Sequence, residues 1–167
     1  KVPYRDRTSI LATFAQSSPG PYIKALAPRS DEYSRLMKEK LRLEKVVGRG
    51  DWGPGIPDVK IEPGASGDAV VALRHRLIRQ GYLKRTTTNT YDARMQNAVR
   101  MFQLDHGLHT DGVVGPGTRR QINTSAATRL SQVIVAMERE RWINFPQGLG
   151  DRHVWVNLAD FRTKLID

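Results

Sequence analysis

The sequence predicts a mainly α-helical protein, in which a small three-helix module is flanked by further helices and a β-strand lies near the C-terminal end. Two observations favour this fold class. Apolar residues recur at spacings of three and four along most of the chain, and residues that start or stop helices stand at the ends of these stretches. Only residues 154–158 change to the alternating pattern of a strand.

Residues 1–57 are expected to form an N-terminal scaffold segment and a linker. Several prolines break the first 29 residues, so only a short helix or strand is expected, over residues 8–16. Ser30 is the predicted N-cap of a longer helix that ends at Gly48. The apolar stripe of that helix comprises Tyr33, Leu36, Met37, Leu41 and Val47. Residues 48–63, rich in Gly and Pro, indicate an irregular connection.

Residues 58–124 are expected to form the three-helix module, because helical apolar spacing is interrupted there by capping residues at short intervals. The predicted caps and first-turn residues are Ser66 or Asp68 and Gly81 for the first helix, Asp92 and Gly107 for the second, and Pro116 for the third. The side chains expected to face the core are Val70, Leu73, Leu77, Met95, Val99 and Phe102.

A second scaffold helix is predicted over residues 125–147, and the start of a catalytic-domain strand over residues 148–167. Ser125 is the expected N-cap. The apolar face of the helix comprises Leu130, Val133, Ile134 and Met137. An isolated strand is unstable without a partner, so the strand is expected to pair with residues 1–16 or with a sheet beyond residue 167.

The composition restricts the function. The net charge is +10, and residues 1–50 alone carry 11 basic and 5 acidic side chains. This excess favours an anionic partner such as nucleic acid, acidic lipid or an anionic polymer, although a solvated basic helix explains it as well. The 167 residues contain no Cys, which excludes disulfides, thiolate metal sites and a cysteine nucleophile within them. The chain begins at Lys1 without Met, which indicates a processed or excised piece.

Neither a metal, an organic cofactor nor a nucleic acid is an expected partner. His106 and His109 are three residues apart in a predicted loop, whereas a zinc site needs three or four converging ligands. Basic residues on the first module helix could imitate a helix-turn-helix protein, but the last helix is short and the aromatic residues are scattered. No apolar run approaches the roughly 20 residues that a membrane span requires.

The predicted module resembles the peptidoglycan-binding domain family over roughly residues 64–123. The matching residues are Gly67-Asp68, Val70, Leu73, Leu77, Gly81-Tyr82, Ala98-Val99, Phe102-Gln103, Gly107-Leu108, Asp111 to Pro116 and Thr118. The resemblance implies a three-helix fold that binds peptidoglycan through its stem peptides or muropeptides. Arg74 departs from the family, which often has Gln at that position.

The flanking segments resemble the large YcbB-type L,D-transpeptidases, in which the binding module lies within a scaffold and precedes a YkuD-type catalytic domain. This resemblance implies a periplasmic or cell-envelope protein that docks on murein and joins its own catalytic domain beyond residue 167. The family's nucleophile is a Cys, so these residues alone are not expected to catalyse the reaction. The alternative is a module that binds a protein partner or braces the catalytic domain without glycan affinity.

Three polar residues are the candidate ligand-binding residues, and no catalytic residue is predicted. Arg74, Gln103 and Asp111 are expected where helices meet loops, the only places in so small a module where a groove can form. Arg74 could pair with a stem-peptide carboxylate, and Gln103 could bind an amide. In the alternative interpretation, Gln103 caps a loop and Asp111 holds its own turn.

Overall fold

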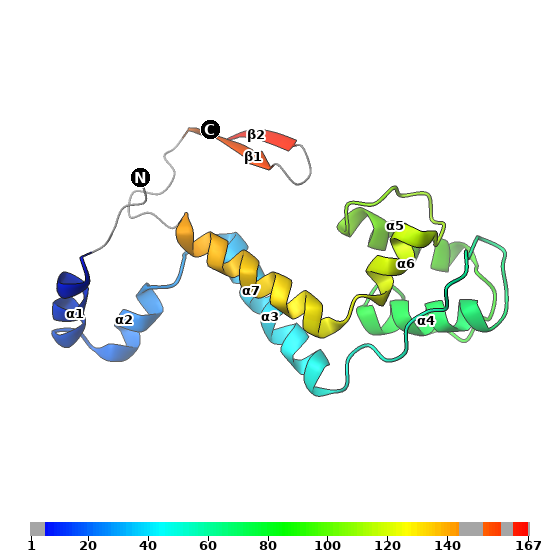
Figure 1. Cartoon of the computed structure of the whole chain (residues 1–167), viewed down its shortest axis with the longest axis horizontal. Helices are drawn as coiled ribbons and strands as arrows, with labels where there is room; N and C mark the ends of the chain where they lie inside the picture. The colour runs from blue at the N-terminus through cyan, green and yellow to red at the C-terminus, as the bar shows by residue number, and fades with distance from the viewer. Residues whose placement is uncertain (1–5, 144–151, 158–161, 167) are drawn as a thin grey trace.

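Two long antiparallel helices, α3 (Asp31–Gly48) and α7 (Ala126–Trp142), form the middle of the computed structural model, which describes residues 6–143, 152–157 and 162–166. They lie side by side although the whole module separates them in the sequence (Figure 1). Hydrogen bonds tie the start of α3 to the end of α7, from Ser30 Oγ to Glu140 and from Arg141 to the Tyr33 hydroxyl. The chain therefore enters and leaves the module through one helical hairpin.

The other elements lie on either side of this hairpin (Figure 1). They are α1 (Arg7–Ala15), α2 (Pro19–Ala25), α4 (Asp68–Gln80), α5 (Ala93–Asp105), α6 (Pro116–Asn123), β1 (His153–Asn157) and β2 (Arg162–Ile166). The predicted fold class is confirmed: the described chain is mostly helical and has a small antiparallel sheet at its C-terminal end. No described helix is both long and apolar enough to cross a membrane.

Helices α4, α5 and α6 enclose the core of the module. All six side chains expected to face this core are buried, and Tyr91, Val114 and Ile122 complete it. Ile56 and Ile61 also belong to the core, because the irregular connection before α4 packs against the module. An isolated bridge between Ile61 and Val114 holds that connection beside the turn that leads into α6.

Most of the predicted helix ends are confirmed, and the N-cap of the first module helix is wrong. Ser30, Asp92 and Ser125 accept the expected N-cap hydrogen bonds, whereas α4 has Gly67 as its N-cap and no side-chain cap. Helix α3 ends at Gly48 as expected, and positive φ angles follow at Gly50 and Asp51. The Asp51 side chain accepts a hydrogen bond from the first residue of α7.

The predicted apolar stripes of the two long helices are wrong in part. Leu41 and Val47 are 49% and 38% exposed, while Leu43, outside the predicted stripe, is 1% exposed. On α7, Ile134 is exposed and Met137 is buried. The reason is that α3 contacts α7 and Trp52 along a narrow seam, which covers only part of each helix's apolar surface. Helical spacing alone could not choose among adjacent apolar residues.

The strand at residues 153–157 is confirmed, but the expected pairing with residues 1–16 is wrong, because Arg7–Ala15 form helix α1. Strand β1 pairs with β2 in an antiparallel hairpin, in which Trp155 lies opposite Lys164. Its partner therefore lies inside the chain, a few residues after it. The sequence of β2, RTKLI, lacks the alternation that identified β1. Helix α2 was also not predicted, because Pro19 starts a helix in its first turn instead of breaking one.

A buried arginine joins the module to the hairpin. Arg76 is 3% exposed and donates hydrogen bonds to three carbonyl groups, those of Ile122 (3.0 Å), Gly53 (2.7 Å) and Thr124 (3.3 Å). Its guanidinium lies 5.6 Å from the centre of the Trp52 ring. Burial lowers the pKa of Arg76, and the nearby charge of Asp51 opposes this shift.

Asp51 completes this junction. Both of its carboxylate oxygens lie 3.1 Å from the Ala126 backbone nitrogen, at the start of α7. The negative charge thus meets the positive end of the α7 helix dipole. The junction fixes the direction in which α7 leaves the module.

Replacing Arg76 with Ala should lower the free energy of unfolding by at least about 2 kcal/mol, because buried carbonyl groups lose their donors and Trp52 loses its neighbour. Arg85→Ala is the control: Arg85 is exposed, so its loss should change stability by no more than about 0.5 kcal/mol. Chemical denaturation measures the free energy of unfolding of both variants. Equal values would show that the contacts of Arg76 do not stabilise the fold.

Candidate functional site

Gln103 lies at the centre of a closed polar network in the turn before α6. Its side chain is 1% exposed. The two hydrogens of the amide nitrogen are shared among three acceptors, Asp111 Oδ1 (2.9 Å), the Val113 carbonyl (3.0 Å) and Thr118 Oγ1 (3.1 Å), and the amide oxygen accepts from the Gly112 backbone (2.8 Å). Every hydrogen-bonding group of Gln103 is therefore used inside the module.

Asp111 contributes to the same network. Its Oδ1 also accepts the Val113 backbone N–H at 2.8 Å, which closes the turn. The hydrogen bonds from Val113 and Gln103 lower the pKa of this carboxyl group. Gly112 has φ +73° at this point, a conformation that side chains rarely adopt. The Tyr91 hydroxyl donates to the Gly112 carbonyl at 2.7 Å, so the turn is tied to the core.

Arg74 lies apart from Gln103 and Asp111. Its side chain is 8% exposed, donates to the Thr88 carbonyl and lies 2.9 Å from His75 Nε2. The structure thus brings two of the three candidate residues together and leaves the third in another contact. Ligand binding by these three residues stays a prediction, and their geometry favours the alternative in which they hold the fold.

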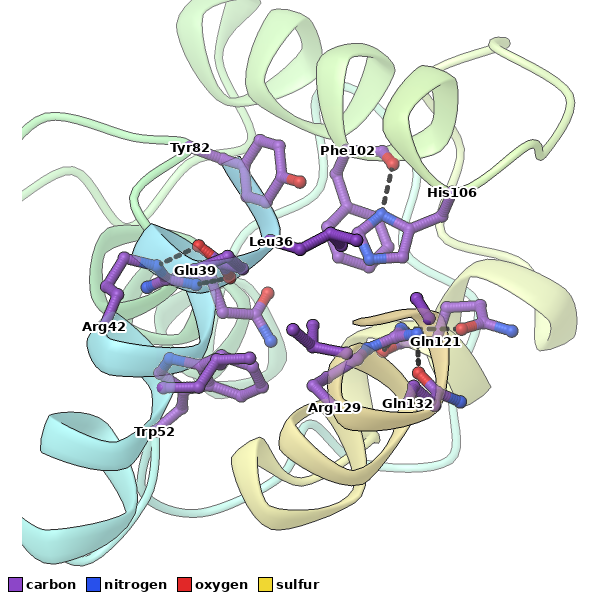
Figure 2. A pocket seen from close by; sticks show the side chains of 14 residues that line it. Leu36, Glu39, Arg42, Trp52, Tyr82, Phe102, His106, Gln121, Arg129 and Gln132 are labelled. Atoms are coloured by element: carbon purple, nitrogen blue, oxygen red, sulfur yellow. Dashed lines mark hydrogen bonds and ion pairs between the residues drawn. The ribbon is translucent and has the colours of Figure 1, made fainter. Parts of the chain in front are cut away.

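A cavity of about 270 Å³ lies where the hairpin meets the module (Figure 2). Helices α3 and α7 supply one side, with Leu36 and Val133 among the apolar lining residues. The module supplies the other side, through Tyr82, Phe102 and His106. The sequence does not reveal this cavity, because the lining residues come from segments up to 100 positions apart and form no local motif.

Charged and amide side chains surround the cavity on two sides. Figure 2 shows Arg42 with Glu39 on one side and Arg129 with two glutamines on the other. Arg42 makes two hydrogen bonds to the Glu39 carboxylate, at 2.8 and 2.6 Å. Arg129 donates only to uncharged groups, namely Gln132 Oε1 (3.1 Å), Gln121 Oε1 (2.6 Å) and the Gln121 carbonyl (3.2 Å).

Aromatic rings from the module form the remaining wall. The His106 ring stacks on Phe102, with 4.0 Å between ring centres, and its Nδ1 lies 2.8 Å from the Phe102 carbonyl. The Tyr82 hydroxyl donates to Asp105 at 3.0 Å. Burial lowers the pKa of His106 and raises that of Tyr82, so both groups are neutral near pH 7.

Within the described part of the chain, no group of three or more His, Cys, Asp or Glu side chains is placed to hold a metal ion. His106 faces a backbone carbonyl, and His109 lies 3.5 Å from Asp111 with most of its side chain in solvent. The cavity has apolar and aromatic walls and two arginines. Arg42 is paired with Glu39, whereas Arg129 contacts only uncharged groups of the described residues.

Gln103→Leu should lower the free energy of unfolding by about 2 kcal/mol, because the buried Gly112 N–H and Val113 carbonyl lose their partner while the side-chain volume changes little. Asn97→Leu, on the exposed face of the same helix, is the control and should have a small effect. Thermal and denaturant unfolding provide the measurement. Equal losses in the two variants would contradict the structural role of this network.

The lowered pKa of His106 should make the fold less stable in acid. Above the reference pKa of 6.5, His106 is neutral in both the folded and the unfolded chain and adds no pH dependence. As the pH falls below 6.5, the unfolded chain takes up the proton first, so stability decreases until the folded pKa is passed. Unfolding measured from pH 7.5 to 5 should show this slope. His106→Gln should reduce it, and His109→Gln should keep it.

One family model matches the part of the chain that contains the module. Residues 66–122 match the family model described as "Putative peptidoglycan binding domain". The crystal structure of the SleB N-terminal domain is similar at 25% sequence identity, covering 50% of this chain and 99% of that chain with a TM-score of 0.37. No match was found among curated proteins. The matched range contains helices α4 and α5 and all of α6 except Asn123, and it covers about a third of the chain.

Proposed function

We propose that this chain is the peptidoglycan-binding and scaffold portion of a bacterial cell-wall L,D-transpeptidase, and that it docks the enzyme on murein in the periplasm. The observation that carries the proposal is the family match over residues 66–122, which coincides with a module that has its own closed core. The proposal includes the division into segments 1–57, 58–124, 125–147 and 148–167.

The proposed mechanism is localisation. A weak contact with a polymer of repeated units keeps a tethered active site near many stem peptides, which raises their effective concentration. The net charge of +10 supports this, because stem peptides carry free carboxylates. The catalytic cysteine would lie in a domain beyond residue 167, since these residues contain none.

The hairpin supports the scaffold part of the proposal. Arg76 and Asp51 fix the module to the start of α7, so the module cannot swing freely on a flexible linker. A fixed orientation would present murein to the catalytic domain from one direction. The resemblance of the flanking sequence to YcbB-type enzymes points to the same arrangement.

A second candidate is a bracing or protein-binding role without glycan affinity. It is favoured by the apolar residues that α7 leaves in solvent, Ile134, Val135 and Trp142, of which Trp142 is 69% exposed. Exposed apolar side chains in a cluster are typical of surfaces that contact another protein. Both roles could coexist, because these residues do not belong to the module.

Co-sedimentation with purified sacculi separates the two functions. A murein-binding chain should pellet with sacculi, should be released by soluble muropeptides, and should bind less as salt rises. A bracing module should remain in the supernatant at every salt concentration. Binding to duplex DNA with a steep loss in salt, together with no binding to sacculi, would instead indicate a nucleic-acid-binding protein.

A further inference from the structure

The cavity between the hairpin and the module contains a cation without an acidic partner. Among the ion pairs of the described residues, none includes Arg129, although Arg42 on the opposite side pairs with Glu39. Arg129 is partly buried, and burial lowers its pKa because the charged form loses solvation. A carboxylate bound beside it would restore that lost stabilisation, and such contacts are among the stronger hydrogen bonds in proteins.

Two residues that line the cavity also have unused polar atoms. Within the described residues, the buried atoms Trp52 Nε1 and Gln80 Oε1 have no hydrogen-bond partner. One is a donor and the other an acceptor, whereas most buried polar atoms are paired. Both side chains line the same cavity as Arg129, so a ligand that enters it to meet the Arg129 charge also meets these two residues.

The size and lining of the cavity limit the ligand further. Its volume of about 270 Å³ lies just below the roughly 300–1,000 Å³ of sites for drug-sized molecules, so one or two amino-acid residues fit better than a whole disaccharide peptide. Leu36, Leu43 and Val133 offer apolar contacts suited to methyl groups. A short peptide end with small side chains meets these conditions.

We propose that this cavity binds the free carboxyl end of a peptidoglycan stem peptide, with Arg129 as the carboxylate partner and Trp52 and Gln80 in the surrounding wall. The choice of a stem peptide as the molecule that carries this carboxylate rests on the proposed function. The site is composite: Arg129 belongs to α7, and Gln80 to α4 of the module. Helix α7 thus has a binding role in addition to its role as a scaffold.

The first test is a titration of the complete 167-residue chain, labelled with ¹⁵N, with N-acetyl-D-alanyl-D-alanine. The indole N–H signal of Trp52 and the side-chain amide of Gln80 should shift. The same dipeptide with a C-terminal amide should bind at least about tenfold more weakly, because it lacks the charge. Equal binding of the two would overturn the role of Arg129. Stronger binding of the L,L form would overturn the stem peptide as the source and indicate a protein C-terminus.

The second test uses variants. Arg129→Gln should weaken binding of the acid at least about tenfold and leave the amide unchanged. Arg120→Gln removes the same charge from an exposed position outside the cavity and should bind like the original chain. Ala136→Leu fills the cavity without changing charge and should weaken binding of both dipeptides. Unfolding curves show whether each variant is folded. If Arg129→Gln does not fold, Ala136→Leu still tests the proposal.

The outcomes distinguish this site from the proposed function. Sacculus binding that persists in Arg129→Gln, with no dipeptide bound by the original chain, would overturn the cavity and leave murein docking intact. Dipeptide binding in the cavity without sacculus binding would support the site and overturn murein docking. If murein docks through this cavity, Arg129→Gln should lose both dipeptide binding and sacculus binding, and Arg120→Gln should keep both.

Discussion

The arrangement of this protein depends on one buried cation. Arg76 is surrounded by backbone carbonyl groups from the connection before α4, from the last turn of α6 and from Thr124 after it, so one side chain holds together parts of the chain that are distant in sequence. A buried charge is costly unless its hydrogen bonds are satisfied, and here the carbonyl groups, the Trp52 ring and the charge of Asp51 supply that compensation. The module and the hairpin are therefore positioned by a polar contact as much as by apolar packing.

This contact explains why the hairpin and the module share a cavity. Trp52 packs with Leu43 and Ala126 in the small core of the hairpin, and it also lies against Arg76 of the module. Next to this point, α3 and α7 leave a space beside Tyr82 and Phe102. The space that remains is lined by both parts. A three-helix module alone would lack the α3 and α7 side of this space, including Arg129.

The sequence predicted the features that depend on local chemistry. Asp92 and Gly81 mark helix ends because capping is a property of a few adjacent residues, and Leu73 and Val99 mark the core because helical spacing is regular. It could not choose between Leu41 and Leu43, because only the position of α7 decides which is covered. It predicted Arg74 as a ligand residue and gave no role to Arg76, although the two are equally basic and only tertiary contacts distinguish them. The cavity was not predictable for the same reason.

The hairpin also has a mechanical consequence. The chain enters and leaves the module at one end of the α3–α7 pair, and the hydrogen bonds of Ser30 and Tyr33 to the last turns of α7 close the other end. Tension applied through the two flanking segments would load these few contacts first and then separate the helices one turn at a time, starting at the end away from the module. The module lies beyond the last turn to separate, so it would stay folded while the hairpin absorbed the extension. The chain would in this way lengthen before its module came under load.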